Sequence, residues 1–386
     1  MNQKIIFALL AGFNFGIIFL NIPPALTLLM DLYALSYTGA SVLMSALLWT
    51  HAFMQIPAGM LADRLSIKTS IALGVGLMAC GNLVPGLAPS YSLAIAGRIA
   101  TGVGSGLSFV SVMKLIVLYS SIGMRGTFQA FFAACFSLGS ILAYLAIPEL
   151  LPLGWQWSYL LPGISCVLLL LIWTFIKLNE QPRNIAVPLP LGRVLRKQTG
   201  WILGFYHALS YGSMMTLGTW VPSLLAEVWA DSTATQLVWG GALTMLVGGI
   251  GRLAGGFIIL KIPALRIVNS SIMVIAILFW CLYAIQIPVV TLVLALTAVW
   301  FASLNFGALF ELVSRTVNSA SVATAFGFVN FLANLGAVLF TLIFGLAKDF
   351  TGTFFGGFLI MALAAATAYF FGKNILQRAG IEDTCN

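Results

Sequence analysis

Charged residues are the scarcest class in this chain. Of its 386 residues only 7% are Asp, Glu, Lys or Arg, while 61% are hydrophobic. A soluble domain carries about 25% charged residues, because its surface must be solvated. No stretch of the sequence reaches that composition, so lipid must replace water around most of the molecule. The composition therefore predicts a membrane protein.

Residues that build metal and catalytic sites are also rare. The two histidines lie far apart, and the five cysteines show no metal or disulfide spacing. No nucleophile–base pair or ligand cluster is evident. We therefore expect no enzyme activity, no metal and no cofactor. The net charge of +8 is spread over short gaps between apolar runs, which argues against a nucleic-acid partner.

Long apolar runs are abundant. A span needs about 20 apolar residues, and twelve such segments can be drawn. They lie near 5–30, 38–61, 69–88, 91–119, 127–147, 156–177, 200–224, 234–260, 267–287, 289–313, 321–347 and 353–373. The polar stretch 178–198 separates six segments from six. We predict an all-α membrane protein with two six-helix bundles, 1–177 and 199–386, joined by a cytoplasmic linker.

The distribution of Lys and Arg predicts the orientation. With the N-terminus inside, fourteen of the 18 basic residues fall in cytoplasmic gaps, three lie within spans, and Lys348 is the one basic residue outside. This bias follows the positive-inside rule, so both termini should be cytoplasmic. We expect a multi-pass protein of the bacterial inner membrane, functioning as a monomer.

The two halves repeat each other at a shift of about 197 residues. Gly59–Lys68 falls against Gly256–Arg266, and Phe128–Phe132 falls against Phe326–Asn330. Repeats of this kind are typical of secondary transporters, whose halves move about a site near the membrane midplane.

Several motifs resemble those of the major facilitator superfamily. The stretch 59–68 is similar to its G-x-L-A-D-R-x-G-R-K signature, with Ser66 and Ile67 as departures. Gly97–Gly106 resembles the arginine and glycine pattern of the fourth helix, and Gly251–Gly256 resembles G-R-x-x-G-G of the eighth. The resemblance covers essentially the whole chain, and the order and spacing of the motifs together make it specific. The resemblance implies twelve helices in two pseudo-symmetric bundles and rocker-switch transport.

The resemblance also implies a gate. Asp63 falls where the superfamily closes its cytoplasmic side, and its carboxylate could pair with Arg64 or Arg125. Alternatively, Asp63, Arg64 and Lys68 are ordinary loop charges that determine topology. Glu311 and Arg315, four residues apart, are expected to form a salt bridge near the gate.

Ionisable residues inside spans are costly and therefore functional candidates. Arg98 and Arg252 lie within spans, whereas no Asp or Glu lies deep in any span. A cavity with these charges would be positive, which favours an anionic substrate. For Arg98 the alternative, helix packing, is the stronger one, and Arg252 could instead brace the gate. Gln55 stands where nitrate-type carriers have an arginine, which disfavours nitrate.

Polar residues along the spans extend the predicted site. The resemblance implies that their helices line the cavity, and the candidates are Asn14, Asn21, Gln129, His207, Tyr211, Asn305, Asn330 and Asn334. His51, His207 and Asp31 are candidates for proton coupling. Interhelical hydrogen bonding is an equally good explanation for the histidines.

The lead hypothesis is thus a carrier for a small, organic or inorganic anion, working by proton symport or exchange. The alternative is efflux of a metabolite, siderophore or drug. Drug antiporters of the superfamily carry G-P-x-x-G-G in their fifth helix, but Phe136–Leu142 contains no proline. A transporter-like sensor would need an added signalling domain, for which the sequence has no candidate segment.

Overall fold

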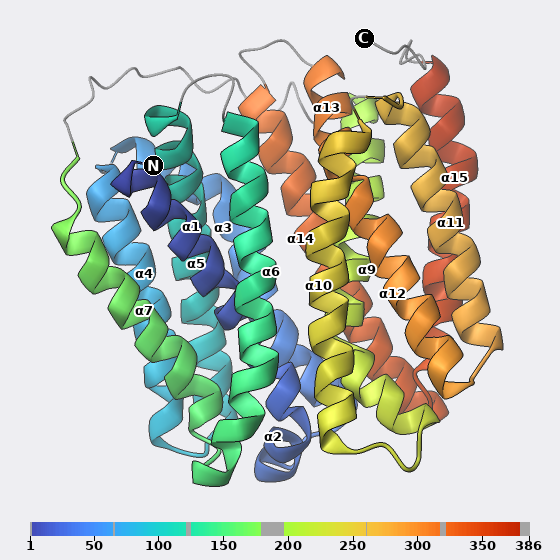
Figure 1. Ribbon diagram of the computed structural model, residues 1–386, viewed down its shortest axis with the longest axis horizontal. Helices are drawn as coiled ribbons and strands as arrows, with labels where there is room; N and C mark the ends of the chain where they lie inside the picture. The colour runs from blue at the N-terminus through green and yellow to red at the C-terminus, as the bar shows by residue number, and fades with distance from the viewer. Residues whose placement is uncertain are drawn as a thin grey trace. The chain divides into compact units, whose positions relative to one another are not determined.

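A computed structural model shows a chain built from long helices (Figure 1). It describes residues 2–64, 66–120, 125–178, 197–259, 261–316 and 322–378. Contacts divide the chain into two compact units, the first half (Met1–Ala186) and the second half (Val187–Asn386). Most of the predicted linker, 179–196, lies outside the described residues.

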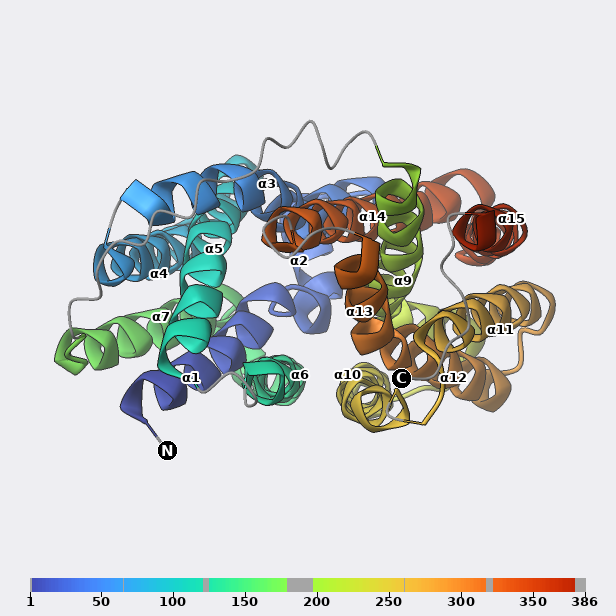
Figure 2. The same ribbon diagram turned by 90° about the horizontal axis from the view of Figure 1, so that it is seen from above.

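The first half is helical throughout its described part. Its elements are α1 (Gln3–Phe19), η1 (Pro23–Ala25), α2 (Leu26–Tyr33), α3 (Tyr37–Arg64), α4 (Ile67–Leu83), η2 (Pro85–Leu87), α5 (Tyr91–Tyr119), α6 (Arg125–Leu150), η4 (Leu151–Leu153) and α7 (Trp157–Phe175). Helix α5 lies at the centre, packed against α3 and α4 (Figure 2).

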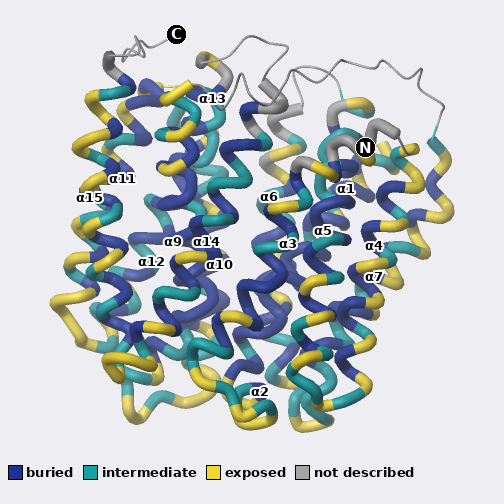
Figure 3. Tube along the Cα trace, turned by 180° about the vertical axis from the view of Figure 1, so that it is seen from behind, coloured by how far each residue is buried: buried dark blue, intermediate teal, exposed yellow. Residues whose placement is uncertain are grey.

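The second half has the same character. Its elements are α9 (Gln198–Val228), α10 (Ala234–Ile258), α11 (Ala264–Ala284), α12 (Pro288–Leu304), α13 (Phe306–Thr316), α14 (Val322–Thr351) and α15 (Phe355–Arg378). Helix α9 packs most extensively on α14 and also contacts α10, α12 and α13. Within each half, buried segments face neighbouring helices, and exposed segments alternate with them (Figure 3).

Ten helical segments of the described residues are long and apolar enough to cross a membrane. The other two predicted spans correspond to α3 and α9, which have 28 and 31 residues. Each carries several buried polar side chains, such as His51 and Gln55 in α3 and His207 and Ser210 in α9. These polar side chains lower the mean hydropathy of α3 and α9, as is usual for a helix that is buried in protein rather than exposed to lipid.

The helix boundaries support the repeat. Four helices of the first half begin at Tyr37, Ile67, Tyr91 and Arg125, and the residues 197 positions later, Ala234, Ala264, Pro288 and Val322, also begin helices. Gln55 is therefore equivalent to Arg252, and Ser108 to Asn305.

Two spans are interrupted. The first breaks after Phe19, just before Pro23 and Pro24, because proline has no N–H to continue the helix. The second break was not predicted: the expected single span 289–313 is divided into α12 and α13 at Asn305. The equivalent helix α5 continues through Ser108.

Glycines allow close helix packing in both halves. A Cβ atom added to Gly139 of α6 would lie 1.8 Å from the Phe13 carbonyl oxygen of α1. A Cβ at the equivalent Gly336 of α14 would lie 2.7 Å from the Ala208 carbonyl oxygen of α9. Both distances are far below van der Waals contact, so each pair of helices can approach only where the side chain is absent.

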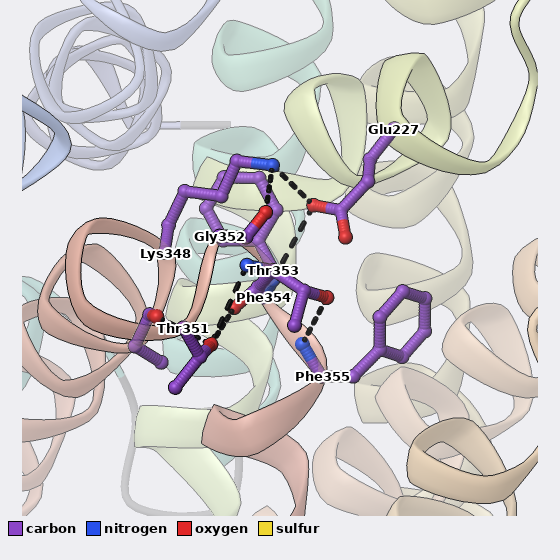
Figure 4. A network of polar contacts seen from close by, with 8 residues as sticks. Glu227, Lys348, Thr351, Gly352, Thr353, Phe354 and Phe355 are labelled. Atoms are coloured by element: carbon purple, nitrogen blue, oxygen red, sulfur yellow. Dashed lines mark hydrogen bonds and ion pairs between the residues drawn. The ribbon is translucent and has the colours of Figure 1, made fainter.

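The turn between α14 and α15 is held by an ion pair (Figure 4). Lys348 donates to Glu227 at the end of α9 over 3.0 Å and to the Gly352 carbonyl over 2.8 Å. The same carboxylate accepts from the Phe354 backbone N–H. Gly352 has φ +75°, and its N–H closes the end of α14 on the Lys348 carbonyl, the left-handed helix termination that glycine favours.

Candidate functional site

A cluster of unpaired polar groups surrounds the break between α12 and α13 in the second half. The guanidinium carbon of Arg252, on α10, lies 5.1 Å from the centre of the Phe306 ring, the first residue of α13. Arg252 makes no hydrogen bond to the described part of the chain, and its Nε atom is buried. An arginine held only against a ring keeps its hydrogen-bond donors available.

His207, on α9, is the second member of this cluster. Its side chain is only 1% exposed, and neither ring nitrogen has a hydrogen-bond partner among the described residues. The ring lies 5.2 Å from Phe310, 5.6 Å from Phe306 and 6.0 Å from Tyr211, centre to centre. The charge of Arg252 lies within electrostatic range of both His207 and Tyr211.

Two polar residues flank the break itself. Asn305 donates from Nδ2 to Ser210 of α9 over 2.8 Å, but its Oδ1 is buried and unpaired, and so is the hydroxyl of Ser303. A buried polar atom without a partner costs about 1–3 kcal/mol. Several such atoms in one place indicate a site whose partners come from a bound solute or water.

The first half treats its buried arginine differently. Arg98, on α5, is 2% exposed and donates four hydrogen bonds, to Ile18 O (3.0 Å), Asn21 Oδ1 (2.9 Å), Leu43 O (3.3 Å) and Met44 O (3.2 Å). The Ile18 carbonyl belongs to the last turn before the proline break. Arg98 thus connects α5 with α1 and α3, a geometry that favours the packing interpretation.

Asn14 of α1 and Asn21, two residues past the end of α1, also connect helices. Asn21 is fully buried, accepts from Arg98 and donates to the Ser158 carbonyl of α7 over 2.8 Å. Asn14 accepts from the Ser165 hydroxyl over 2.5 Å and donates to Cys166 Sγ over 3.4 Å. Both side chains therefore face α7, and the amide nitrogen and oxygen of each have a protein partner.

His51, on α3, belongs to a closed hydrogen-bond chain. The Ser105 hydroxyl donates to the Gly102 carbonyl, so it accepts from His51 Nδ1 over 2.9 Å. Nε2 then accepts from the Gln55 amide over 2.8 Å. These directions assign the neutral tautomer with hydrogen on Nδ1. Both ring nitrogens of His51 are satisfied, in contrast to those of His207.

The remaining candidates do not join either group. Gln129 of α6 and Asp31 of α2 are exposed. Asn334 donates to the Asn330 carbonyl one turn earlier on α14, and its Oδ1 is buried and unpaired. No contact between these four residues and Arg252 is seen in the described part of the chain.

A comparison with known families decides the identity of the fold. The model of the Major Facilitator Superfamily matches residues 5–341. The chain belongs to this superfamily. It is a transporter rather than an enzyme, as are its matched relatives.

Individual superfamily members match over most of their length. A probable L-galactonate transporter of Escherichia coli is 23% identical over 87% of this chain and 81% of that protein. A hexuronate transporter of Bacillus subtilis is 24% identical over 90% and 87%, respectively. The cyanate transport protein CynX of Escherichia coli is 23% identical over 64% of each chain.

Solved structures of superfamily members share the fold. A D-xylose-proton symporter has a TM-score of 0.77 at 16% identity and covers 95% of this chain and 96% of its own. A bacterial homologue of the lysosomal transporter Spinster, inward-facing and unoccupied, also has a TM-score of 0.77 at 16% identity, with 98% of each chain covered.

The gating residues expected of a superfamily member are only partly described. The side chains of Asp63, Arg64 and Arg125 lie outside the described residues. Lys68 donates to the Ile176 carbonyl just past the last turn of α7, over 3.3 Å, where a positive charge is favourable. Arg315 pairs with Glu311 on α13. The role of these residues in gating stays a prediction.

Sequence reasoning missed the aromatic part of the site. Phe306 and Phe310 contact His207, and Phe306 alone of these two contacts Arg252. The repeat pairs Phe306 with Phe109 of the first half, but the contact that distinguishes Phe109, 5.6 Å from the His51 ring, is visible only in the structure. An aromatic ring thus accompanies the buried polar residues at the same position of both halves.

Proposed function

We propose that the protein is a secondary transporter of a small organic anion, with Arg252 binding the acid group. The supporting observation is that Arg252, held against Phe306 in the second half, has no acidic or hydrogen-bonded partner among the described residues. An unpaired guanidinium binds a carboxylate through charge-assisted and often bidentate hydrogen bonds. In this proposal the carrier works by rocker-switch alternating access, with both termini in the cytoplasm.

The donors and acceptors of the cluster favour a hydroxylated acid. A neutral imidazole offers one donor and one acceptor, and both nitrogens of His207 are unpaired. A hydroxyl group can satisfy both roles, whereas nitrate only accepts hydrogen bonds. A hydroxycarboxylate therefore fits Arg252 and His207 together better than a simple inorganic anion. The relatives named for galactonate and hexuronate are consistent with this substrate class.

His207 is our candidate for proton coupling. It lies near the proposed anion, and its ring nitrogens are not occupied by the protein. Its titratable or charged neighbours are Tyr211 and Arg252. His51 is closed in its own chain, and Asp31 is exposed on α2. In this proposal the anion enters with a proton, or in exchange for a second anion.

Uptake into proteoliposomes tests the proposal. The panel contains a sugar acid, an unsubstituted monocarboxylate, nitrate, cyanate and the neutral sugar, each with and without an inward proton gradient. We expect the sugar acid to be preferred and Arg252→Gln to lose most of its uptake. Lys261→Gln is the matched control, because it removes an equal charge from an exposed position beyond α10.

The outcomes separate the alternatives. Stimulation of uptake by the proton gradient supports symport. Stimulation only by organic acid preloaded inside the vesicles supports exchange. Equal uptake by Arg252→Gln and the wild type would overturn the anion site. Transport of cationic drugs without transport of any acid would support the efflux alternative instead.

A further inference from the structure

One aromatic ring contacts both charged or titratable members of the site. The Phe306 ring lies 5.1 Å from the Arg252 guanidinium and 5.6 Å from the His207 ring, at an interplanar angle of 60°. Phe310, one turn later on α13, lies 4.9 Å from Phe306. Phe306 therefore contacts both Arg252 and His207.

The position of this ring is determined by the break in the helix. Asn305 ends α12 with φ −83° and ψ 0°, and its amide is hydrogen-bonded to Ser210 of α9. That bond attaches the break to the helix that carries His207, three residues before Ser210. The first residue of α13 is thereby held close to His207 and to α10.

A ring holds a guanidinium differently from a carboxylate. The face of an aromatic ring attracts a cation through its quadrupole, without accepting a conventional hydrogen bond. A carboxylate in the same place would neutralise Arg252 and occupy its N–H groups. The ring therefore restrains Arg252 while leaving both its charge and its donors for another partner.

The first half offers the contrasting arrangement. Phe109, equivalent to Phe306, contacts His51, but the position equivalent to Arg252 is the neutral Gln55. There the polar groups bond to each other, and no cation lies over the ring in the described contacts. Only the second half combines the ring with an unpaired arginine.

We propose that Phe306 is a positioning residue, which holds the Arg252 guanidinium ready for the substrate anion without neutralising it. This inference rests on the proposed function, in which Arg252 binds the acid group. Phe306 need not touch the substrate. Its effect should therefore appear as weaker substrate binding, with little change in the maximal rate of transport.

Uptake kinetics of Phe306 variants test the role. Phe306→Leu removes the quadrupole and should raise KM for the acid about 5- to 30-fold, with kcat within about twofold. Phe306→Tyr keeps the ring and should restore KM to within about threefold of the wild type. Phe109→Leu is the matched control at the equivalent position, and its KM should not change.

A charge-placement variant sharpens the same test. Phe306→Glu supplies an internal carboxylate beside Arg252 and should abolish uptake of the acid. Phe306→Gln, of similar size but neutral, should resemble Phe306→Leu. If Phe306→Leu is not recovered from the membrane, Phe306→Met provides the same comparison with a flexible apolar chain.

The result can separate this inference from the proposed function. If Arg252→Gln leaves KM unchanged, the proposed function fails. A second outcome is that Arg252→Gln raises KM, whereas Phe306→Leu, like its control Phe109→Leu, keeps the KM of the wild type. In that case only the role of Phe306 is overturned. Failure of Phe306→Tyr to rescue a raised KM would also overturn it, because the ring itself would not be the cause.

Discussion

Positions 55 and 252 are equivalent in the two halves, yet their surroundings differ. Gln55 bonds to His51, which bonds to Ser105, and the chain ends on a backbone carbonyl. Arg252 lies against the Phe306 ring and has no hydrogen-bond partner among the described residues. Eleven buried side-chain atoms of the described chain lack a hydrogen-bond partner, and nine of them belong to the second half.

The difference indicates a division of labour between two copies of one scaffold. In the first half, Arg98 and His51 are satisfied by the protein, so their hydrogen bonds stabilise the fold. In the second half, Arg252 and His207 are left unpaired at a cost to stability. An external partner would offset such a cost, which is why the proposed function has the anion bind in the second half.

The largest predicted effect concerns the close helix contacts at glycine that both halves share. Gly139→Val and Gly336→Val each place a branched side chain against a backbone carbonyl of the neighbouring helix. Backbone cannot move aside as a side chain can, so each variant should lose more than about 3 kcal/mol of stability. We expect little folded protein by size-exclusion chromatography in detergent. Gly327→Ala, whose Cβ would meet nothing within 4 Å, should behave as the wild type.

Replacing the two buried arginines should change the stability of the protein by different amounts. Arg98→Gln leaves several buried carbonyl groups without their charged donor and should cost about 3–5 kcal/mol, seen as a lower melting temperature. Arg252→Gln breaks no hydrogen bond to the described chain, so its melting temperature without substrate should stay close to the wild type. Equal destabilisation by the two variants would contradict the comparison.

The histidines should show effects of opposite sign. His51→Leu leaves Gln55 and Ser105 without their partner and should cost about 1–3 kcal/mol. His207→Leu removes two unpaired atoms from an aromatic surrounding, so it should be neutral or stabilising while it weakens uptake. Melting temperatures measured beside uptake rates check both signs. A strongly destabilised His207→Leu would show that the ring has a structural role.

The smallest predicted effect lies at the turn between α14 and α15. The Glu227–Lys348 pair is partly exposed, at 17% and 18% of the side-chain surface, so water and salt screen it. Glu227→Gln should cost about 0.5–1 kcal/mol, and the cost should shrink at high salt. A melting curve at two ionic strengths measures this. A loss as large as that of Arg98→Gln would place this turn among the main supports of the second half.

The sequence predicts much of the scaffold, because apolar runs mark the spans directly and the 197-residue repeat can be read by comparing one half of the sequence with the other. It favours helix packing for Arg98 but does not identify the partners of this residue, since the carbonyl groups that accept from Arg98 come from residues more than 50 positions away. It also does not reveal the break at Asn305, which is stabilised by a bond to Ser210 on another helix. Phe306 is one of 28 phenylalanines, and only tertiary contacts identify it.

Equilibrium binding of the transported acid to purified variants tests the central claim most directly. If the second half holds the anion, Arg252→Gln should weaken binding by at least about 30-fold, the loss of a charge-assisted hydrogen-bonded contact. Lys261→Gln should bind within about twofold of the wild type. The account would be contradicted if Arg252→Gln bound the acid normally while Arg98→Lys lost binding at an unchanged melting temperature.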